Sequence, residues 1–164
     1  MKVFLIAAIS ADGFIARETN EVADWTSKED KKLFVELTKR AGVMVMGRTT
    51  FETIGHALPG RKTIVYTHRD VEIEDVEVTD DAPANLVHRL HTEGYKEVAI
   101  CGGSAMYTQF MQAGVVDELY LTIEPVLFGS GVPLFAGQLE TRMQLIESRS
   151  LNDNVVLMHY EVEK

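Results

Sequence analysis

Short apolar runs that alternate with helix signals constrain the fold of this chain more than any other feature. Residues 3–9, 43–46 and 97–101 are almost entirely apolar, which is typical of strands buried on both faces of a sheet. Helix signals lie between these runs, so strands and helices alternate along the chain. This alternation predicts an α/β fold in three layers, in which helices flank a mostly parallel central sheet.

Local signals predict where the helices begin and end. Thr26-Ser27 offers a capping hydroxyl before an acidic first turn, and Gly42 is suited to end the helix expected over 27–41. Pro83 is typical of a first helical turn, and that helix is expected to reach Glu93. Other expected elements are strands at 62–67, 76–78 and 117–124, helices at 47–55 and after 103, and extended runs at 143–150 and 155–162. The last two runs predict an antiparallel hairpin at the C-terminal edge of the sheet.

Size and charge narrow the class of protein. The 164 residues are enough for one domain, and no linker or repeat interrupts 1–164, so we expect a single domain. Sixteen Lys and Arg against 25 Asp and Glu give a net charge of −9, which repels nucleic-acid and lipid phosphates. We therefore expect no nucleic-acid or membrane partner. An anionic ligand would have to meet clustered Arg side chains.

Cys101 is the single cysteine, so the chain can form no internal disulfide and has no thiolate cluster for zinc. We expect no metal site, and a reducing cytoplasm is the compartment that fits best. The apolar run at 3–9 is only seven residues long and is followed by Asp12-Gly13, so we expect no export signal.

The most informative segment is 46–62, which reads MGRTTFETIGHALPGRK. It resembles the dihydrofolate reductase family. In that family a strand end followed by Gly-Arg-x-Thr places helix N-terminal amides and a basic side chain against cofactor phosphates. The resemblance implies the dihydrofolate reductase-like fold, NADPH as the cofactor, and reduction of 7,8-dihydrofolate to tetrahydrofolate for one-carbon metabolism.

A second part of the resemblance concerns the chemistry. Asp30 and Phe34 share one helix face, and Trp25 precedes Asp30 by five residues. The family's single buried acid bonds the amide edge of the pterin and supports protonation of nitrogen 5, while hydride reaches carbon 6. The resemblance therefore gives Asp30 and Trp25 catalytic roles, and Thr122 the role of holding the carboxylate. A first-turn acid is also stabilised by the helix dipole alone, so a structural Asp30 is the alternative.

The Leu-Pro-Gly-Arg turn extends the resemblance to the substrate. In the family its Arg binds a carboxylate of the folate glutamate tail, which suits a planar two-pronged donor, and Arg61 is at that position. A turn with a solvated Arg is the alternative. The substrate-binding residues implied by the resemblance are Ile6, Ala8, Phe34, Ile54, Leu58, Arg61, Cys101 and Tyr107.

Gly102-Gly103 follows a strand and opens a helix, so the backbone there can approach a pyrophosphate. The segment lacks the G-x-G-x-x-G spacing, which disfavours an ordinary NAD-type Rossmann domain. The loop at 10–25 resembles the family's mobile loop over the ring. Cofactor-binding residues implied by the resemblance are Ala7, Ile15, Gly47, Arg48, Thr49, Thr50, Thr67, His68, Arg69, Gly102, Gly103, Ser104, Ala105 and Met106.

Two departures leave alternatives open. Many family members carry an Arg where this chain has Ala105, which leaves Arg48, His68 and Arg69 to bind a 2′-phosphate. Residues 129–135 instead resemble the reductase domain of riboflavin biosynthesis, so the runner-up is a ribosylamino-pyrimidine or other pterin reductase. A third hypothesis, from a different functional class, is a nucleotide-binding or scaffolding domain that has the fold but no catalytic activity. The chain is compatible with a monomer or, through the late hairpin, a homodimer.

Overall fold

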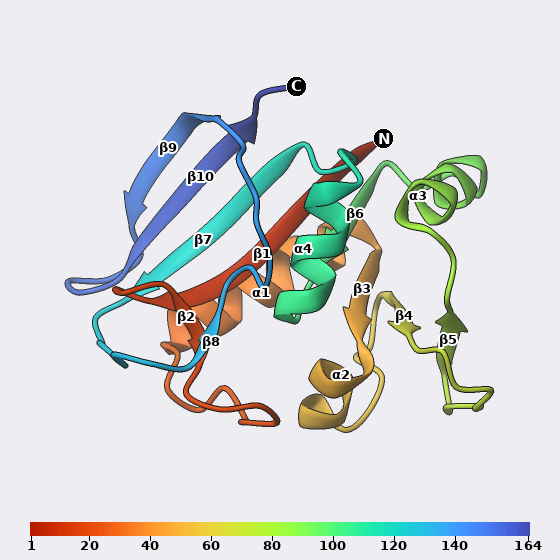
Figure 1. The fold of residues 1–164 in the computed structure, drawn as a ribbon, viewed down its shortest axis with the longest axis horizontal. Helices are drawn as coiled ribbons and strands as arrows, with labels where there is room; N and C mark the ends of the chain where they lie inside the picture. The colour runs from red at the N-terminus through yellow and green to blue at the C-terminus, as the bar shows by residue number, and fades with distance from the viewer.

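The computed structural model describes residues 1–164, and its centre is an eight-stranded sheet in the order β5-β4-β3-β6-β1-β7-β10-β9 (Figure 1). The strands from β5 to β7 are parallel to one another, whereas β10 runs antiparallel to both β7 and β9. This confirms the predicted sheet and its antiparallel edge. The strands are β1 (Lys2–Ser10), β3 (Val43–Gly47), β4 (Lys62–Tyr66), β5 (Val76–Thr79), β6 (Glu97–Ile100), β7 (Glu118–Glu124), β9 (Met143–Ser150) and β10 (Val156–Val162).

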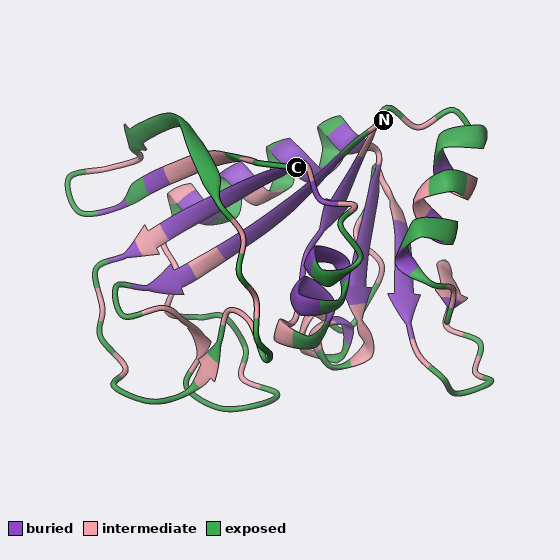
Figure 2. Cartoon of the chain, turned by 45° about the horizontal axis from the view of Figure 1, so that its top comes forward, coloured by how far each residue is buried: buried purple, intermediate pink, exposed green.

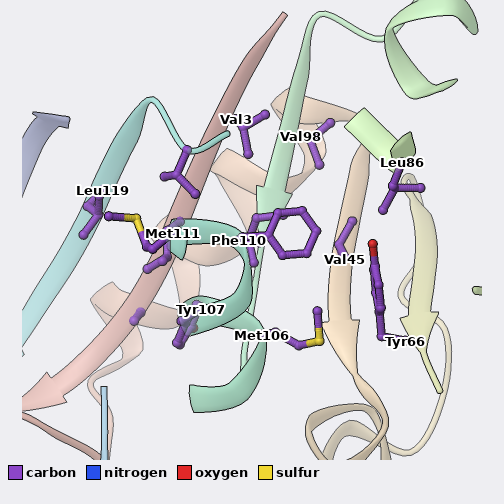
Figure 3. Close-up of a cluster of buried hydrophobic side chains, with 14 of the residues drawn as sticks. Val3, Val45, Tyr66, Leu86, Val98, Met106, Tyr107, Phe110, Met111 and Leu119 are labelled. Atoms are coloured by element: carbon purple, nitrogen blue, oxygen red, sulfur yellow. The ribbon is translucent and has the colours of Figure 1, made fainter. Parts of the chain in front are cut away.

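Four helices cover the two faces of the sheet and complete the three predicted layers. They are α1 (Lys28–Ala41), α2 (Arg48–Ile54), α3 (Pro83–Thr92) and α4 (Ser104–Gln112). Leu33 and Leu37 of α1 and Phe51 of α2 pack on one face. Leu86 of α3 and Phe110 of α4 pack on the other, where β1, β3 and β6 supply valine and isoleucine side chains (Figure 3). Both faces of the central strands are therefore buried, which explains their continuous apolar runs.

The ends of α1 form as the sequence predicts. The Ser27 Oγ accepts a hydrogen bond from the Asp30 backbone N–H at 3.1 Å, and Gly42 ends the helix with φ +77°. A left-handed residue at this position favours glycine, because a Cβ would be strained there. The cap fixes the first turn of α1, which carries Asp30.

A second, two-stranded sheet was not predicted from the sequence. β2 (Phe14–Ala16) pairs antiparallel with β8 (Val132–Pro133) below the ends of the central strands (Figure 1). The expectation of a loop throughout 10–25 is therefore wrong at β2. The β2–β8 pair links residues 14–16 to the 129–135 segment, so these two segments lie side by side.

The C-terminal hairpin forms the open edge of the sheet. All residues of β9 are exposed, including Leu145 and Ile146 (Figure 2). On β10, His159 stacks on Tyr120 with ring centroids 3.9 Å apart and contacts Glu118 at 2.8 Å. These contacts attach the hairpin to β7. No helix of the structure has the length and apolar character needed to span a bilayer.

Candidate active site

A cleft of about 850 Å³ lies at the carboxyl ends of β1, β3 and β6. The neighbouring strands β1 and β6 lead, through β2 and directly, to α1 and α4, which cover opposite faces of the sheet. Such divergence leaves a crevice, where open α/β sheets bind ligands. Most residues predicted for the site line this cleft: Ile6, Ala7, Ala8, Ile15, Trp25, Asp30, Phe34, Gly47, Arg48, Thr49, Thr50, Ile54, Leu58, Cys101, Gly102, Gly103, Ser104, Ala105, Met106 and Tyr107.

Asp30 supplies a buried carboxyl group to the cleft, with 8% of the residue exposed. Burial raises the pKa of Asp30 to about 6; a hydrogen bond from the Thr122 side chain opposes this rise, and the charge of Glu124 adds to it. A carboxyl that titrates near neutrality can hold and release a proton at physiological pH. Thr122 does not line the cleft, and its predicted role of holding the Asp30 carboxylate stays a prediction.

Two aromatic side chains stand on either side of Asp30 in the sequence and line the same cleft. Phe34 lies one helical turn after Asp30 on α1. Trp25 packs edge-on against Phe128, with ring centroids 5.0 Å apart, and its Nε1 is buried without a hydrogen-bond partner. The surface of the cleft is thus mainly apolar and includes aromatic faces, which suits a flat heterocycle.

The glycine turn brings backbone close to the floor of the cleft. A Cβ on Gly102 would lie 3.3 Å from the Thr50 Oγ1 and 3.4 Å from the Tyr107 hydroxyl oxygen. Its φ of +121° also favours glycine. The Tyr107 hydroxyl donates a hydrogen bond to the Ile6 carbonyl at 2.6 Å and so ties α4 to β1. A side chain at Gly102 or Gly103 would therefore crowd Thr50, so the turn requires glycine at both positions.

Unsatisfied polar atoms gather near the start of α4. Gly103 caps this helix without a side-chain acceptor, and the Ser104 Oγ is buried with no partner. Arg48 donates from Nε to Glu52 at 2.9 Å, but its Nη1 is also buried without a partner. A helix N-terminus with a free hydroxyl and a guanidinium N–H fits an anionic group such as a dinucleotide phosphate.

Two further titratable groups that line the cleft stay uncharged at neutral pH. Burial raises the pKa of Cys101 to about 12 and also raises the pKa of Tyr107 above its ordinary value. Cys101 therefore acts as a small apolar side chain at neutral pH, and its thiol is not a candidate nucleophile.

Three residues predicted to bind the cofactor follow β4 and lie outside the cleft lining. His68 and Arg69 are exposed, and the Thr67 Oγ1 accepts a hydrogen bond from the Arg69 backbone N–H at 3.1 Å. Their cofactor roles stay predictions. Arg48 is the arginine that lines the cleft.

Arg61 also lies outside the lining. Its Nη1 donates to the Pro59 carbonyl at 2.8 Å, whereas its Nε is buried without a partner. Burial lowers the pKa of the guanidinium from its ordinary value. The predicted carboxylate contact of Arg61 stays a prediction.

Several lining residues were not predicted from the sequence. Lys31 brings a cation next to Asp30, and Tyr66 reaches the cleft from the end of β4. Val132 enters it through the β2–β8 pair. Lys31 could have been predicted, because it directly follows Asp30 in the sequence. No local pattern in the sequence points to Tyr66 or Val132. The remaining residues of this group are Ala16, Glu18, Thr19, Asn20, Glu21, Ala23, Thr26, Val35 and Thr53.

Curated proteins similar to this chain fall into two groups. The uncharacterised protein YyaP of Bacillus subtilis is 25% identical over 177 residues, covering 97% of this chain and 94% of that protein. Dihydrofolate reductase of Buchnera aphidicola is 37% identical over 123 residues, covering 74% of this chain and 71% of that enzyme. The chain thus has relatives of known activity over about three quarters of its length.

Solved structures match the whole fold. A riboflavin biosynthesis protein, so described only provisionally, from Shewanella sp. PV-4 superposes with a TM-score of 0.83 at 23% identity, covering 100% of both chains. Dihydrofolate reductase from Enterococcus faecalis, complexed with NADP(H) and RAB-propyl, gives a TM-score of 0.75 at 26% identity, covering 99% of this chain and 97% of that one. The family model of the RibD C-terminal domain matches residues 1–157. The chain therefore belongs to the RibD C-terminal domain family, a reductase-like family within the dihydrofolate reductase-like superfamily.

Proposed function

We propose that this chain is an NADPH-dependent reductase that converts 7,8-dihydrofolate to tetrahydrofolate. The observation that carries the proposal is Asp30, a buried carboxyl with a pKa of about 6 in an otherwise mainly apolar cleft. Reduction of the N5=C6 bond requires a hydride at carbon 6 and a proton at nitrogen 5. Asp30 is suited to the proton side of this reaction.

At the end of the cleft that we assign to the substrate, some side chains bind the pterin and others position the proton donor. Trp25 and Phe34 provide apolar walls for the pterin, and the Asp30 carboxyl accepts hydrogen bonds from its amide edge. Thr122 orients that carboxyl. Exclusion of water by the walls keeps the pKa of Asp30 high, so part of the population carries a proton at neutral pH.

At the cofactor end, Arg48, the Ser104 hydroxyl and the amides at the start of α4 would hold the phosphates. Ala7 and Ile15 would contact the nicotinamide ring, and the backbone of Gly102-Gly103 would lie close to the pyrophosphate. When bound, NADPH supplies the hydride. Arg48 is the residue best placed in the cleft to distinguish NADPH from NADH.

A ribosylamino-pyrimidine reductase is the second candidate. The match of residues 1–157 to the RibD C-terminal domain favours it, as does Val132 of the 129–135 segment in the cleft lining. Both reactions add a hydride and a proton to a C=N bond, so Asp30 suits both. Arg61 is the residue expected to distinguish the two substrates, because of the two only folate carries a glutamate tail that it could bind.

The test is a substrate panel with purified protein. We expect loss of NADPH absorbance with 7,8-dihydrofolate, much slower loss with NADH, and none with the ribosylamino-pyrimidine phosphate. Turnover of the pyrimidine alone would replace the first candidate with the second. Absence of turnover with both, at protein concentrations that bind NADPH, would contradict the proposal and favour a non-catalytic nucleotide-binding domain.

A further inference from the structure

Glu124 is a buried carboxylate that the proposed reaction does not use. It ends β7 two residues after Thr122 and is 2% exposed. It forms no ion pair with a lysine or arginine. A buried acid without a cation is costly unless hydrogen bonds stabilise it. Its position therefore calls for an explanation in terms of the groups it contacts.

Its hydrogen bonds lead to the first turn of α1. The Glu124 Oε1 accepts from both the backbone N–H and the Oγ of Ser27, each at 2.8 Å. The same Ser27 Oγ accepts from the Asp30 N–H at 3.1 Å. An ionised carboxylate can only accept hydrogen bonds, so the Ser27 hydroxyl donates its hydrogen to Glu124. The lone pairs of the Ser27 Oγ then remain free to accept from the Asp30 backbone N–H. Glu124 thus specifies the cap that holds Asp30.

Glu124 also acts on Asp30 through space. Its negative charge is among the causes that raise the pKa of Asp30, after burial itself. The other titratable groups that bear on this carboxyl are Lys31 on α1, which lowers its pKa, and Tyr107 on α4. Tyr107 is neutral because burial raises its own pKa. Glu124 is therefore the anionic influence on Asp30 from the sheet side.

We propose that Glu124 is a positioning residue of the reductase site, because through Ser27 it fixes the turn that carries Asp30. The negative charge of Glu124 supports the same role, since it favours the protonated form of the Asp30 carboxyl. This inference rests on the proposed function only in assigning Asp30 to the reaction. The link from Glu124 to Asp30 can be measured without any substrate. Glu124 itself does not line the cleft.

The primary experiment is an NMR titration of the Asp30 carboxyl carbon in the protein without substrate, in wild type and in Glu124→Gln. Glutamine keeps the Oε1 acceptor but removes the charge, so the Asp30 midpoint should fall by roughly half to one pH unit. The matched control is Glu118→Gln, the same change at another buried acid at the far end of β7. It should leave the Asp30 midpoint unchanged. An unchanged midpoint in Glu124→Gln, or an equal shift in both variants, would overturn the charge effect.

The positioning effect is tested with Glu124→Asp, which keeps the charge but shortens the reach to Ser27. We expect the Asp30 midpoint to stay closer to wild type, while turnover falls about tenfold or more at unchanged NADPH affinity. Wild-type turnover in Glu124→Asp would overturn the positioning role. If no substrate is turned over by wild type, the proposed function fails, but the Glu124→Gln titration still decides whether Glu124 acts on Asp30.

Discussion

At the scale of single residues, two effects act in opposite directions on Asp30. The first turn of a helix favours an anion, because unpaired N–H groups and the helix dipole lie there. Burial in the cleft disfavours the anion, and it prevails, since the pKa is raised to about 6. An acid serving only as a helix cap would gain nothing from this burial. The balance of the two effects thus favours a role in chemistry.

Asp30→Asn should lower turnover of dihydrofolate by about 10²- to 10⁴-fold near neutral pH, because the amide cannot relay a proton. NADPH affinity should change little, since Asp30 faces the substrate end of the cleft. Steady-state kinetics and fluorescence titration with NADPH measure the two effects. An active variant would remove Asp30 from the mechanism.

The same substitution should stabilise the fold above neutral pH. The folded-state pKa of about 6 lies above the model-peptide value of 3.8, so folding disfavours the ionised form and the penalty is complete above both values. Asp30→Asn should therefore raise the free energy of unfolding at pH 8 by about 1–3 kcal/mol. Urea denaturation at pH 8 and pH 4 tests this, because the gain should shrink as pH falls through 6 toward 4. A gain that is independent of pH would contradict the electrostatic account.

At the scale of elements, the starts of α2 and α4 face one end of the cleft. Arg48 opens α2, Ser104 opens α4, and Gly47 and Gly102 are joined by a backbone hydrogen bond of 2.8 Å between them. This bond holds the ends of β3 and β6 together, so two helix N-termini and a guanidinium are brought to one place. Neither helix alone would provide this concentration of donors.

Arg48→Ala should weaken NADPH binding about tenfold to a hundredfold and NADH binding less, because a charge-assisted phosphate contact is typically worth about 1.5–3 kcal/mol. Dissociation constants for the two dinucleotides measure the difference. Arg69→Ala is the comparison variant, because Arg69 is the other arginine predicted to bind the 2′-phosphate but is exposed outside the cleft lining. Equal losses for NADPH and NADH, or a larger effect of Arg69→Ala, would move the 2′-phosphate site away from Arg48.

The turn at 59–61 is the element that should separate the two candidate substrates. Arg61→Ala should raise the Michaelis constant for dihydrofolate roughly thirty- to several-hundredfold if its guanidinium pairs with the glutamate tail in a partly shielded site. A truncated pterin without that tail should bind both proteins about equally. If dihydrofolate kinetics do not change, the Pro59 contact is the function of Arg61, and the folate assignment loses its main support.

At the scale of the whole molecule, Glu118 joins the C-terminal hairpin to the parallel part of the sheet. It contacts His159 of β10 at 2.8 Å and Lys2 of β1 at 2.7 Å. Burial raises the pKa of Glu118, but hydrogen bonds from Lys2 and His159 outweigh it, so the pKa is lowered overall. Both termini and the antiparallel edge are thereby connected through one carboxylate.

Glu118→Gln should lower the free energy of unfolding at pH 7 by about 1–2 kcal/mol, because it removes the anionic partner of Lys2 and weakens the hydrogen bond with His159. A lowered folded-state pKa stabilises the fold above the ordinary carboxyl range, and this contribution is lost as pH falls through the folded-state value. The deficit should thus be present at pH 7 and should shrink in urea denaturation as the pH falls below the ordinary carboxyl range. A deficit that persists in acid would indicate packing rather than charge.

Much of the fold follows from local patterns in the sequence. The central strands β1, β3 and β6 are almost entirely apolar because both of their faces are buried, and α1 is bounded by Ser27 and Gly42, whose effects act within a few residues. The same holds for the grouping of Asp30 with Phe34, which helical spacing places on one face. These features were predictable because the residues that determine them are neighbours in sequence.

Other features were decided only by tertiary structure. β2 and β8 are three and two residues long and pair across more than a hundred positions of the chain, so neither has a pattern of its own. Tyr66 lines the cleft, whereas Arg61 does not, because the convergence of strand ends determines which side chains reach it. The pKa of Asp30 likewise depends on burial and on Glu124 from a distant strand. The sequence by itself determined the elements and the chemical groups; the packing of distant segments decided which of those groups share the cleft and how they titrate.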